Sequence, residues 1–208
     1  MLQQVVQLNF YEFISKKMLN YLSKYLKLKQ LEYEKLFLGI MILTINILEF
    51  SIIFTISFFM GIIKEIIIFS IMFASLRCVA AGIHCKSSLM CIITTSISYI
   101  GSVYISINYS LNIYFNLIII IICMTLLYKY APADTENRPI LGEEHRKKLK
   151  FITMIMATIL IIINLLLLNK TLFNLTMFVF IIETISVLPC TYKFTKKSYN
   201  NYEKYNIV

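Results

Sequence analysis

The sequence lacks tryptophan and is poor in the residues that interrupt helices, with 5 glycines and 3 prolines among 208 residues. It contains no internal repeat and no low-complexity tract, which excludes a repeat architecture. Acidic residues are also scarce: 11 Asp and Glu stand against 20 Lys and Arg, for a formal net charge of +9. In the absence of tryptophan, we expect tyrosines to anchor the ends of membrane spans. The candidates are Tyr33, Tyr109, Tyr128 and Tyr130.

Two further absences concern secretion and disulfide bonds. The amino terminus has no short apolar core followed by small residues, and Glu12 and six lysines come before residue 36. We therefore expect no cleaved signal peptide. The cysteines number 5, an odd count, and no pair falls in a predicted outer loop. This favours reduced thiols on the cytoplasmic side over a disulfide framework.

Apolar residues are abundant, at 59% of the total, far above the content of a soluble domain. Six apolar segments approach or exceed the roughly 20 residues that cross a bilayer as a helix. They predict an all-α, polytopic membrane protein with six transmembrane helices, folded as one domain over residues 1–208. The predicted spans are 36–60, 62–80, 88–107, 111–128, 151–168 and 171–189. The second span is the weakest prediction, because Lys64 and Glu65 lie near its start.

The two ends of the chain and its polar segments predict its orientation. Residues 1–35 carry apolar side chains at helical spacing, with lysines largely on the other faces. This favours an amphipathic helix in the membrane interface over a soluble cap. Basic residues concentrate in this segment, in the insert 77–87, in the loop 129–150 and in the tail 190–208. The positive-inside rule therefore places both termini and the insert in the cytoplasm. We expect anionic lipid or an acidic partner, and no nucleic acid, to meet this charge.

The stretch from Arg77 to Cys91 is a polar interruption that holds one of the 2 histidines and three of the 5 cysteines. His84 and Cys91 are seven residues apart, which is about 10.5 Å along a continuous helix and too far for proton transfer. Gly82 and the serines between them predict a break, with Ser88 as the N-cap of the next helix. Cys91 is then the third residue of that helix, where the helix dipole favours a thiolate. The pattern predicts a cysteine nucleophile with His84 as its general base.

Other interpretations of this insert stay open. The cysteine and the histidine are also ordinary residues of a membrane core and its interface. A metal site is a rival use, but ligand spacings of six, one and six residues match no usual zinc pattern, and we expect no metal and no cofactor. Its ligands would be Cys78, His84, Cys85 and Cys91. No third catalytic residue is evident. The candidates to orient the histidine are Glu49, Asp134 and Glu183.

Four residues of the insert share the spacing R-x4-G-x-H-x6-C, and they are Arg77, Gly82, His84 and Cys91. This spacing resembles the motif of the accessory gene regulator protein B (AgrB) family. The segment Y-A-P-A-D-T-E-N-R-P-I at Tyr130–Ile140 is similar to the proline-containing cytoplasmic loop after that family's fourth span. The insert departs from the family at Ala81, where a second glycine is common, and at Cys85, where a small residue is more usual. The resemblance includes size, basic character and six-span layout, so it covers most of the chain.

The resemblance implies a cysteine endopeptidase of bacterial quorum sensing, a multi-pass protein of the plasma membrane with a cytoplasmic active site. Its substrate would be a short amphipathic signal pro-peptide, from which it removes an acidic carboxyl-terminal tail. The remaining peptide would close into a thiolactone or lactone ring. Cys91 would be the nucleophile and His84 the general base, with Arg77 and Gly82 as supports of the site. Arg77 would bind a carboxylate of the tail or anchor the second span. The resemblance also implies a homodimer.

A small membrane transporter or peptide exporter is the alternative from another functional class. Its path would use Glu49, Glu183 and a stripe of small residues on the third predicted span. The stripe consists of Cys91, Thr95, Ser98, Ser102 and Ser106. Such a stripe is typical of close helix packing, which we favour, or lines a groove. The basic residues of 143–150 are likewise either topology signals or a surface for an acidic peptide.

Overall fold

A computed structural model of the protein describes residues 2–25, 29–83, 85, 87–109, 111–136 and 139–205. The regular secondary structure of these residues is helical, and one isolated parallel bridge joins Ala81 to Ala133. The predicted all-α class is therefore confirmed. The helices are α1 (Leu2–Ser23), α2 (Gln30–Phe59), α3 (Ile63–Ala80), α4 (Ser88–Asn108), α5 (Ile113–Tyr130), α6 (Glu143–Leu167), α7 (Lys170–Val187), α8 (Pro189–Phe194) and the 3-10 helix η1 (Asn201–Tyr205).

The first of two compact units consists of Met1–Met60 and Cys85–Ser96. In it, α1 packs against α2. Leu19 of α1 is buried, whereas Phe13 and Tyr21 are exposed. An amphipathic helix that lies in a membrane interface presents such an apolar side to lipid.

Helix α2 begins at Gln30, inside the segment 1–35 that the sequence assigns to the amino-terminal element. The reason is a local cap, because the Lys29 amide donates to the Glu32 carboxylate at 2.9 Å. A glutamate at this position stabilises a helix start by accepting a hydrogen bond from the N-cap backbone. The cap therefore lets the first membrane helix start before its apolar run.

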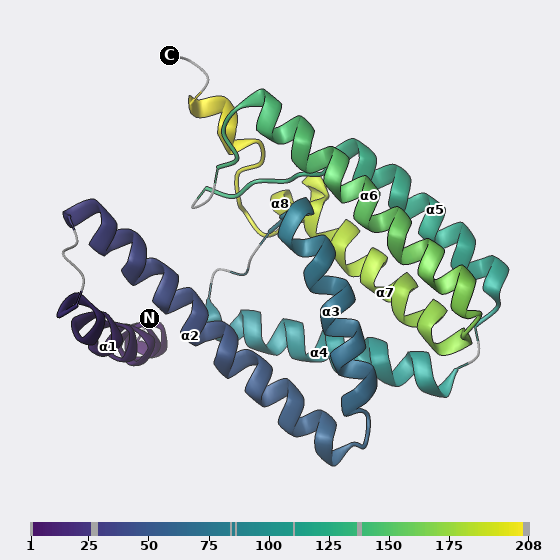
Figure 1. Ribbon diagram of the computed structural model, residues 1–208, viewed down its shortest axis with the longest axis horizontal. Coiled ribbons are helices and arrows are strands. Elements are labelled where there is room, and N and C mark those ends of the chain that lie inside the picture. The colour runs from purple at the N-terminus through teal and green to yellow at the C-terminus, as the bar shows by residue number, and fades with distance from the viewer. Residues whose placement is uncertain are drawn as a thin grey trace. The chain divides into compact units, whose positions relative to one another are not determined.

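The second compact unit consists of Gly61–His84 and Ile97–Val208. Figure 1 shows α5, α6 and α7 running side by side, and α3 packs against α6 and α7. Of the apolar part of α7, 56% is buried, against 22% or 28% for the other helices long and apolar enough to cross a membrane. A helix that is apolar on all sides is expected to lie inside a bundle, and α7 is accordingly the central helix of this unit.

Buried polar side chains join the helices of this unit to one another. Asn116 on α5 donates a hydrogen bond to Asn174 on α7 at 2.6 Å, and Asn164 on α6 donates to Thr176 on α7 at 2.7 Å. A hydrogen bond between membrane helices contributes about 0.6 kcal/mol on average. These pairs therefore fix the register of α7 more than they stabilise the bundle.

Five of the described helices are long and apolar enough to cross a membrane, and they are α2 over Glu32–Phe59, α4 over Leu89–Asn108, α5, α6 and α7. The protein is thus a multi-pass membrane protein. The remaining predicted span, 62–80, is present as the 18-residue helix α3. It carries Lys64, Glu65 and Arg77 within its 18 residues, whereas each of the other five contains an 18-residue apolar stretch with at most two charged side chains. The predicted six-helix layout therefore agrees with the fold, with α3 as the polar member.

Part of the predicted loop 129–150 is helical. Helix α6 begins at Glu143, well before the apolar run at 151. Its first turn carries Glu143 and Glu144, and acidic side chains there interact favourably with the helix dipole. Its basic residues from 143 on, which are Arg146, Lys147, Lys148 and Lys150, consequently lie on a helix instead of a loop.

The predicted break in the insert is confirmed. Helix α3 ends at Ala80, α4 begins at Ser88, and the described residues between them are not helical. The first hydrogen bond of α4 runs from the Cys91 amide to the Ser87 carbonyl at 3.0 Å. Ser87 is therefore the N-cap residue instead of Ser88, because the N-cap carbonyl accepts the first helical bond. Cys91 is the fourth residue of α4, one position later than predicted, and lies in its first turn.

Candidate active site

Cys91 is half-buried in the first turn of α4, within the first compact unit. The Thr95 side chain and the backbone of Cys85 lie beside its thiol. Glu49 of α2 belongs to the same compact unit as this sulfur. This carboxyl group is buried, and its Oε1 has no hydrogen-bond partner among the described residues. The Cys91 thiol thus lies beside a hydroxyl group and a backbone segment at the start of a membrane helix, with the buried Glu49 carboxyl group in the same compact unit.

Gly82 lies at a crowded point of the second unit, where the chain leaves α3. Its amide donates to the Ala133 carbonyl at 2.8 Å, and its φ is +113°. A Cβ at this position would collide with the guanidinium of Arg77 and the hydroxyl of Ser186. Only glycine combines this φ with so close an approach. Ala81 has a φ of 59°, a conformation that favours glycine, at the position where a second glycine is common in the resembled family.

Arg77 lies in the last turn of α3 and donates hydrogen bonds to the loop that follows this helix. Its Nη1 donates to the Ala81 carbonyl at 2.6 Å and to the Ser186 hydroxyl at 2.5 Å, and its Nη2 donates to the Ile83 carbonyl. The Ile83 amide donates to the Ser186 carbonyl at 2.9 Å. Ile83 is therefore held at both its amide and its carbonyl group. Neither of the two roles that the sequence suggested for Arg77 anticipates these internal hydrogen bonds.

Glu183 of α7 supplies the counter-charge of Arg77. Its Oε2 lies 3.6 Å from Nη1 of Arg77, and the side chain is 0% exposed. Its carboxylate oxygens have no hydrogen-bond partner among the described residues. A buried charge pair is costly to form, but removing one partner leaves an uncompensated charge and costs about 3–5 kcal/mol. The pair therefore ties the loop after α3 to the core helix. We call Arg77, Gly82, Ile83, Glu183 and Ser186 the loop frame.

His84 lies outside the described residues. Of the three carboxylates considered as its orienting group, Asp134 accepts hydrogen bonds from the amides of Asn201 and Tyr202 at 2.9 and 2.8 Å. It thus fastens η1 of the tail. Glu183 forms an ion pair with Arg77. Of the three carboxylates, Glu49 is the one in the same compact unit as Cys91.

The stripe on α4 contributes to packing within the second unit. Ser102 and Ser106 are buried, and the Ser106 hydroxyl donates to the Ser102 carbonyl at 2.7 Å. Asn174 of α7 donates to the Ser106 carbonyl at 3.2 Å. These contacts fit the packing interpretation. Among the described residues, no three His, Cys, Asp or Glu side chains gather as a metal site requires.

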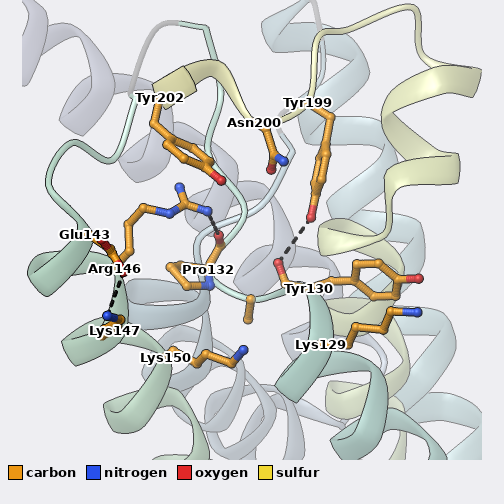
Figure 2. Close-up of a pocket in the computed structure, with 11 residues that line it drawn as sticks. Lys129, Tyr130, Pro132, Glu143, Arg146, Lys147, Lys150, Tyr199, Asn200 and Tyr202 are labelled. Atoms are coloured by element: carbon orange, nitrogen blue, oxygen red, sulfur yellow. Dashed lines mark hydrogen bonds and ion pairs between the residues drawn. The ribbon is translucent and has the colours of Figure 1, made fainter. Parts of the chain in front are cut away.

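A separate cavity of about 610 Å³ opens where α5 ends and α6 begins. Figure 2 shows basic side chains from both helices at one end of it and residues of the carboxyl-terminal tail at the other. Tyr199 of the tail is half-buried there, and Asp134 accepts hydrogen bonds from the amides of the tail. Burial raises the pKa of the Tyr199 phenol above its usual value, and its OH donates to the Tyr130 carbonyl at 3.4 Å. We call this the basic cavity, and its lining is Lys129, Tyr130, Ala131, Pro132, Glu143, Arg146, Lys147, Lys150, Tyr199, Asn200 and Tyr202.

No sequence pattern singles out Ser186 or the tail tyrosines, and the pairing of Glu183 with Arg77 was not predicted. Ser186 acts partly through its backbone carbonyl, which any residue type supplies. Tyr199 and Tyr202 sit in a basic tail that is explained by topology alone. A buried acid in an apolar helix was the one available signal, because such a residue requires a partner.

Comparisons with known proteins give a consistent result. Residues 15–187 match the family described as Accessory gene regulator B. An AgrB-like protein of Clostridium acetobutylicum is 38% identical over 184 residues, which is 88% of each chain. An AgrB-like protein of Listeria innocua is 32% identical over 83% of this chain and 85% of its own. Accessory gene regulator protein B of Staphylococcus aureus is 26% identical over 81% of this chain and 89% of its own. No solved structure matches the chain.

Proposed function

Because the chain belongs to the accessory gene regulator B family, we propose that it is a membrane cysteine endopeptidase that matures a quorum-sensing peptide. Its substrate is a short amphipathic signal pro-peptide with an acidic carboxyl-terminal tail. The enzyme removes the tail, and the remaining peptide closes into a thiolactone or lactone ring. The protein acts in the bacterial plasma membrane as a homodimer, with both termini and the active site in the cytoplasm.

The reaction needs one nucleophile and one base. His84 takes the proton of the Cys91 thiol, and the sulfur attacks the carbonyl carbon before the tail. The C–N bond breaks, the proton passes to the leaving amine, and a thioester joins the peptide to Cys91. A thiol or hydroxyl group within the bound peptide then attacks the thioester. This step closes the ring and returns a proton to the Cys91 sulfur, so no other energy source is required.

The loop frame is the observation that carries the assignment of roles. Ile83 immediately precedes His84, and its amide and carbonyl are both hydrogen-bonded, to Ser186 and Arg77 respectively. Arg77 and Gly82 therefore act as positioning residues for the backbone up to Ile83, the residue directly before the proposed general base. A base must come within about 3 Å of the proton that it abstracts, so the path of the backbone before it matters to the chemistry.

The start of α4 supports the proposed role of Cys91 as the nucleophile. The Cys91 amide is committed to the Ser87 carbonyl, which leaves the amides of Leu89 and Met90 as candidates to stabilise the oxyanion. Amides in the first turn of a helix have no acceptor four residues before them inside the helix. Preorganised donors of this kind contribute about 3–4 kcal/mol in acyl transfer.

Co-expression with candidate short pro-peptides tests the proposal. Cys91→Ala is expected to abolish both the truncated and the cyclised product in a mass spectrum of cells and medium. Cys85→Ala is the matched control, because it removes the exposed neighbouring thiol and should keep the activity. Cys91→Ser should retain little, because a serine hydroxyl is scarcely ionised near neutral pH. Truncated, cyclised peptide from the Cys91→Ala protein would exclude the proposed endopeptidase activity.

A further inference from the structure

The basic cavity has more positively charged side chains than its one acidic side chain neutralises. Four of its lining side chains are basic and one is acidic. The acid, Glu143, pairs with Lys147 at 2.6 Å. Arg146 is held by the tail and the loop: its guanidinium stacks on the Tyr202 ring at 3.5 Å, donates to the Pro132 carbonyl at 3.4 Å and lies 3.9 Å from Asp134.

Lys129 and Lys150 remain. Within the described part of the chain, neither ammonium group lies within ion-pair distance of a carboxylate. Each is positioned over an aromatic ring instead, Lys129 at 5.2 Å from the Tyr130 centroid and Lys150 at 4.5 Å from that of Tyr128. Figure 2 shows both at the same end of the cavity, opposite the tail residues Asn200 and Tyr202. A hollow with two such ammonium groups is suited to an anion.

The surroundings indicate which anion. Lys129 belongs to the last turn of α5, and Lys150 directly precedes the apolar run of α6. The two ammonium groups therefore lie at the ends of the apolar stretches of these helices, where the headgroups of a bilayer are expected. Apolar side chains continue from the cavity along these helices: Phe151 is 67% exposed, one turn beyond Lys147, and Tyr128 is 60% exposed beside Lys150. The ligand that fits carries a negative charge and an apolar chain in one molecule.

We infer that the basic cavity binds the phosphodiester headgroup of an anionic phospholipid, with Lys129 and Lys150 as its principal cations and the acyl chains along α5 and α6. Basic pockets between membrane helices on the cytoplasmic side are suited to such headgroups. The site is separate from the catalytic residues proposed above and does not depend on their chemistry.

Lipid retention by the full-length purified protein tests this inference. The protein, in a mild detergent, is titrated with phosphatidylglycerol, and bound lipid is counted by native mass spectrometry. Each cation near an anionic lipid surface contributes about 1 kcal/mol, so Lys129→Gln/Lys150→Gln is expected to weaken phosphatidylglycerol retention about 30-fold. Phosphatidylcholine, which has no net charge, should be retained weakly by both proteins.

Two further variants separate the site from net charge and from folding. Lys148→Gln/Lys193→Gln removes the same charge from exposed lysines that do not line the cavity, and it should keep the retention of the unchanged protein. Lys129→Arg/Lys150→Arg preserves the charge and should keep most of it. Pro-peptide processing, measured on the same samples, reports on the separate catalytic proposal.

Several results would overturn the inference. Equal retention of phosphatidylglycerol by the Gln variant and the unchanged protein would do so, as would equal binding of phosphatidylcholine. Complete displacement of the lipid by millimolar inorganic phosphate would assign the cavity to a soluble anion. If the unchanged protein bound a glutamate-rich peptide and retained no phosphatidylglycerol, the cavity would be a peptide site.

Discussion

The glycines of this protein differ in whether the structure has room for a Cβ atom at their position. Gly82 has a positive φ, and an added Cβ would collide with Arg77 and Ser186, whereas Gly101 in α4 has nothing within 4 Å of such an atom. We predict that Gly82→Ala lowers stability by about 1–3 kcal/mol, the cost of a strained backbone residue. It should also reduce processing, because Arg77 must give up part of its hold on the loop.

The measurement is apparent thermal unfolding in detergent together with the yield of processed peptide. Gly101→Ala is the control and is expected to be neutral or slightly stabilising, because alanine favours a helix interior by about 1 kcal/mol over glycine. If the two substitutions have the same effect, the loop frame does not constrain Gly82 as described.

The sequence predicted which residues belong to the site more readily than it predicted which groups those residues contact. The insert, with its glycine, cysteines and histidine, stands out against apolar flanks and predicts where a site lies. The partners of Arg77 could not be predicted, because they come from backbone carbonyls and from α7, which lies far along the chain. Hydrogen bonds to a backbone leave no trace in residue type.

At the scale of the element, α8 gives a prediction on pH. Tyr192 is buried in α8, its hydroxyl has no hydrogen-bond partner among the described residues, and burial raises the pKa of its phenol. In the unfolded chain a tyrosine ionises near pH 10. Stability from the neutral phenol is therefore present below about pH 10 and is lost as the pH rises above it.

Replacing the phenol by a phenyl ring removes this dependence. Tyr192→Phe keeps the ring that contacts Tyr199 with centroids 5.1 Å apart, so it should be neutral or stabilising at pH 8. Between pH 8 and 10.5 its unfolding temperature is expected to fall less than that of the unchanged protein. Parallel falls for the two proteins would show that the phenol does not ionise on unfolding in this range.

Element boundaries show where sequence patterns succeed and fail. The break between α3 and α4 follows from Gly82 and from Ser87 and Ser88, since local chemistry decides it. The early start of α6 follows from Glu143 and Glu144, which look like loop residues if only hydropathy is considered. Charged residues at the end of a membrane helix are compatible with either a helix or a loop. The length of the apolar run alone therefore predicts such helix boundaries poorly.

The orientation of the whole molecule is testable through Cys85, which is exposed. We predict that it lies at the cytoplasmic face, because the basic segments are assigned to that side. In a protein that keeps only this cysteine, a membrane-impermeant maleimide should label inverted vesicles and leave intact cells unlabelled. Labelling of intact cells would reverse the topology and place the site outside.

At the same scale, the apolar pattern predicted the helical class and the number of long helices well. It could not rank the helices by burial, because a helix in lipid and a helix in a protein core are equally apolar. Helix α7 is the example: its central place follows from contacts with α3, α5 and α6. The basic cavity was likewise beyond prediction, since it forms where two helix ends meet the tail.

Direct capture of the peptide on the enzyme tests the account most closely. The full-length protein is mixed with its pro-peptide, quenched in acid and digested, and the fragment that contains Cys91 is examined by mass spectrometry. We predict an adduct of the tail-less peptide on Cys91 that hydroxylamine removes and that is absent from the Cys91→Ala protein. An adduct on Cys85, or processing that continues without any thiol-linked peptide, would contradict it.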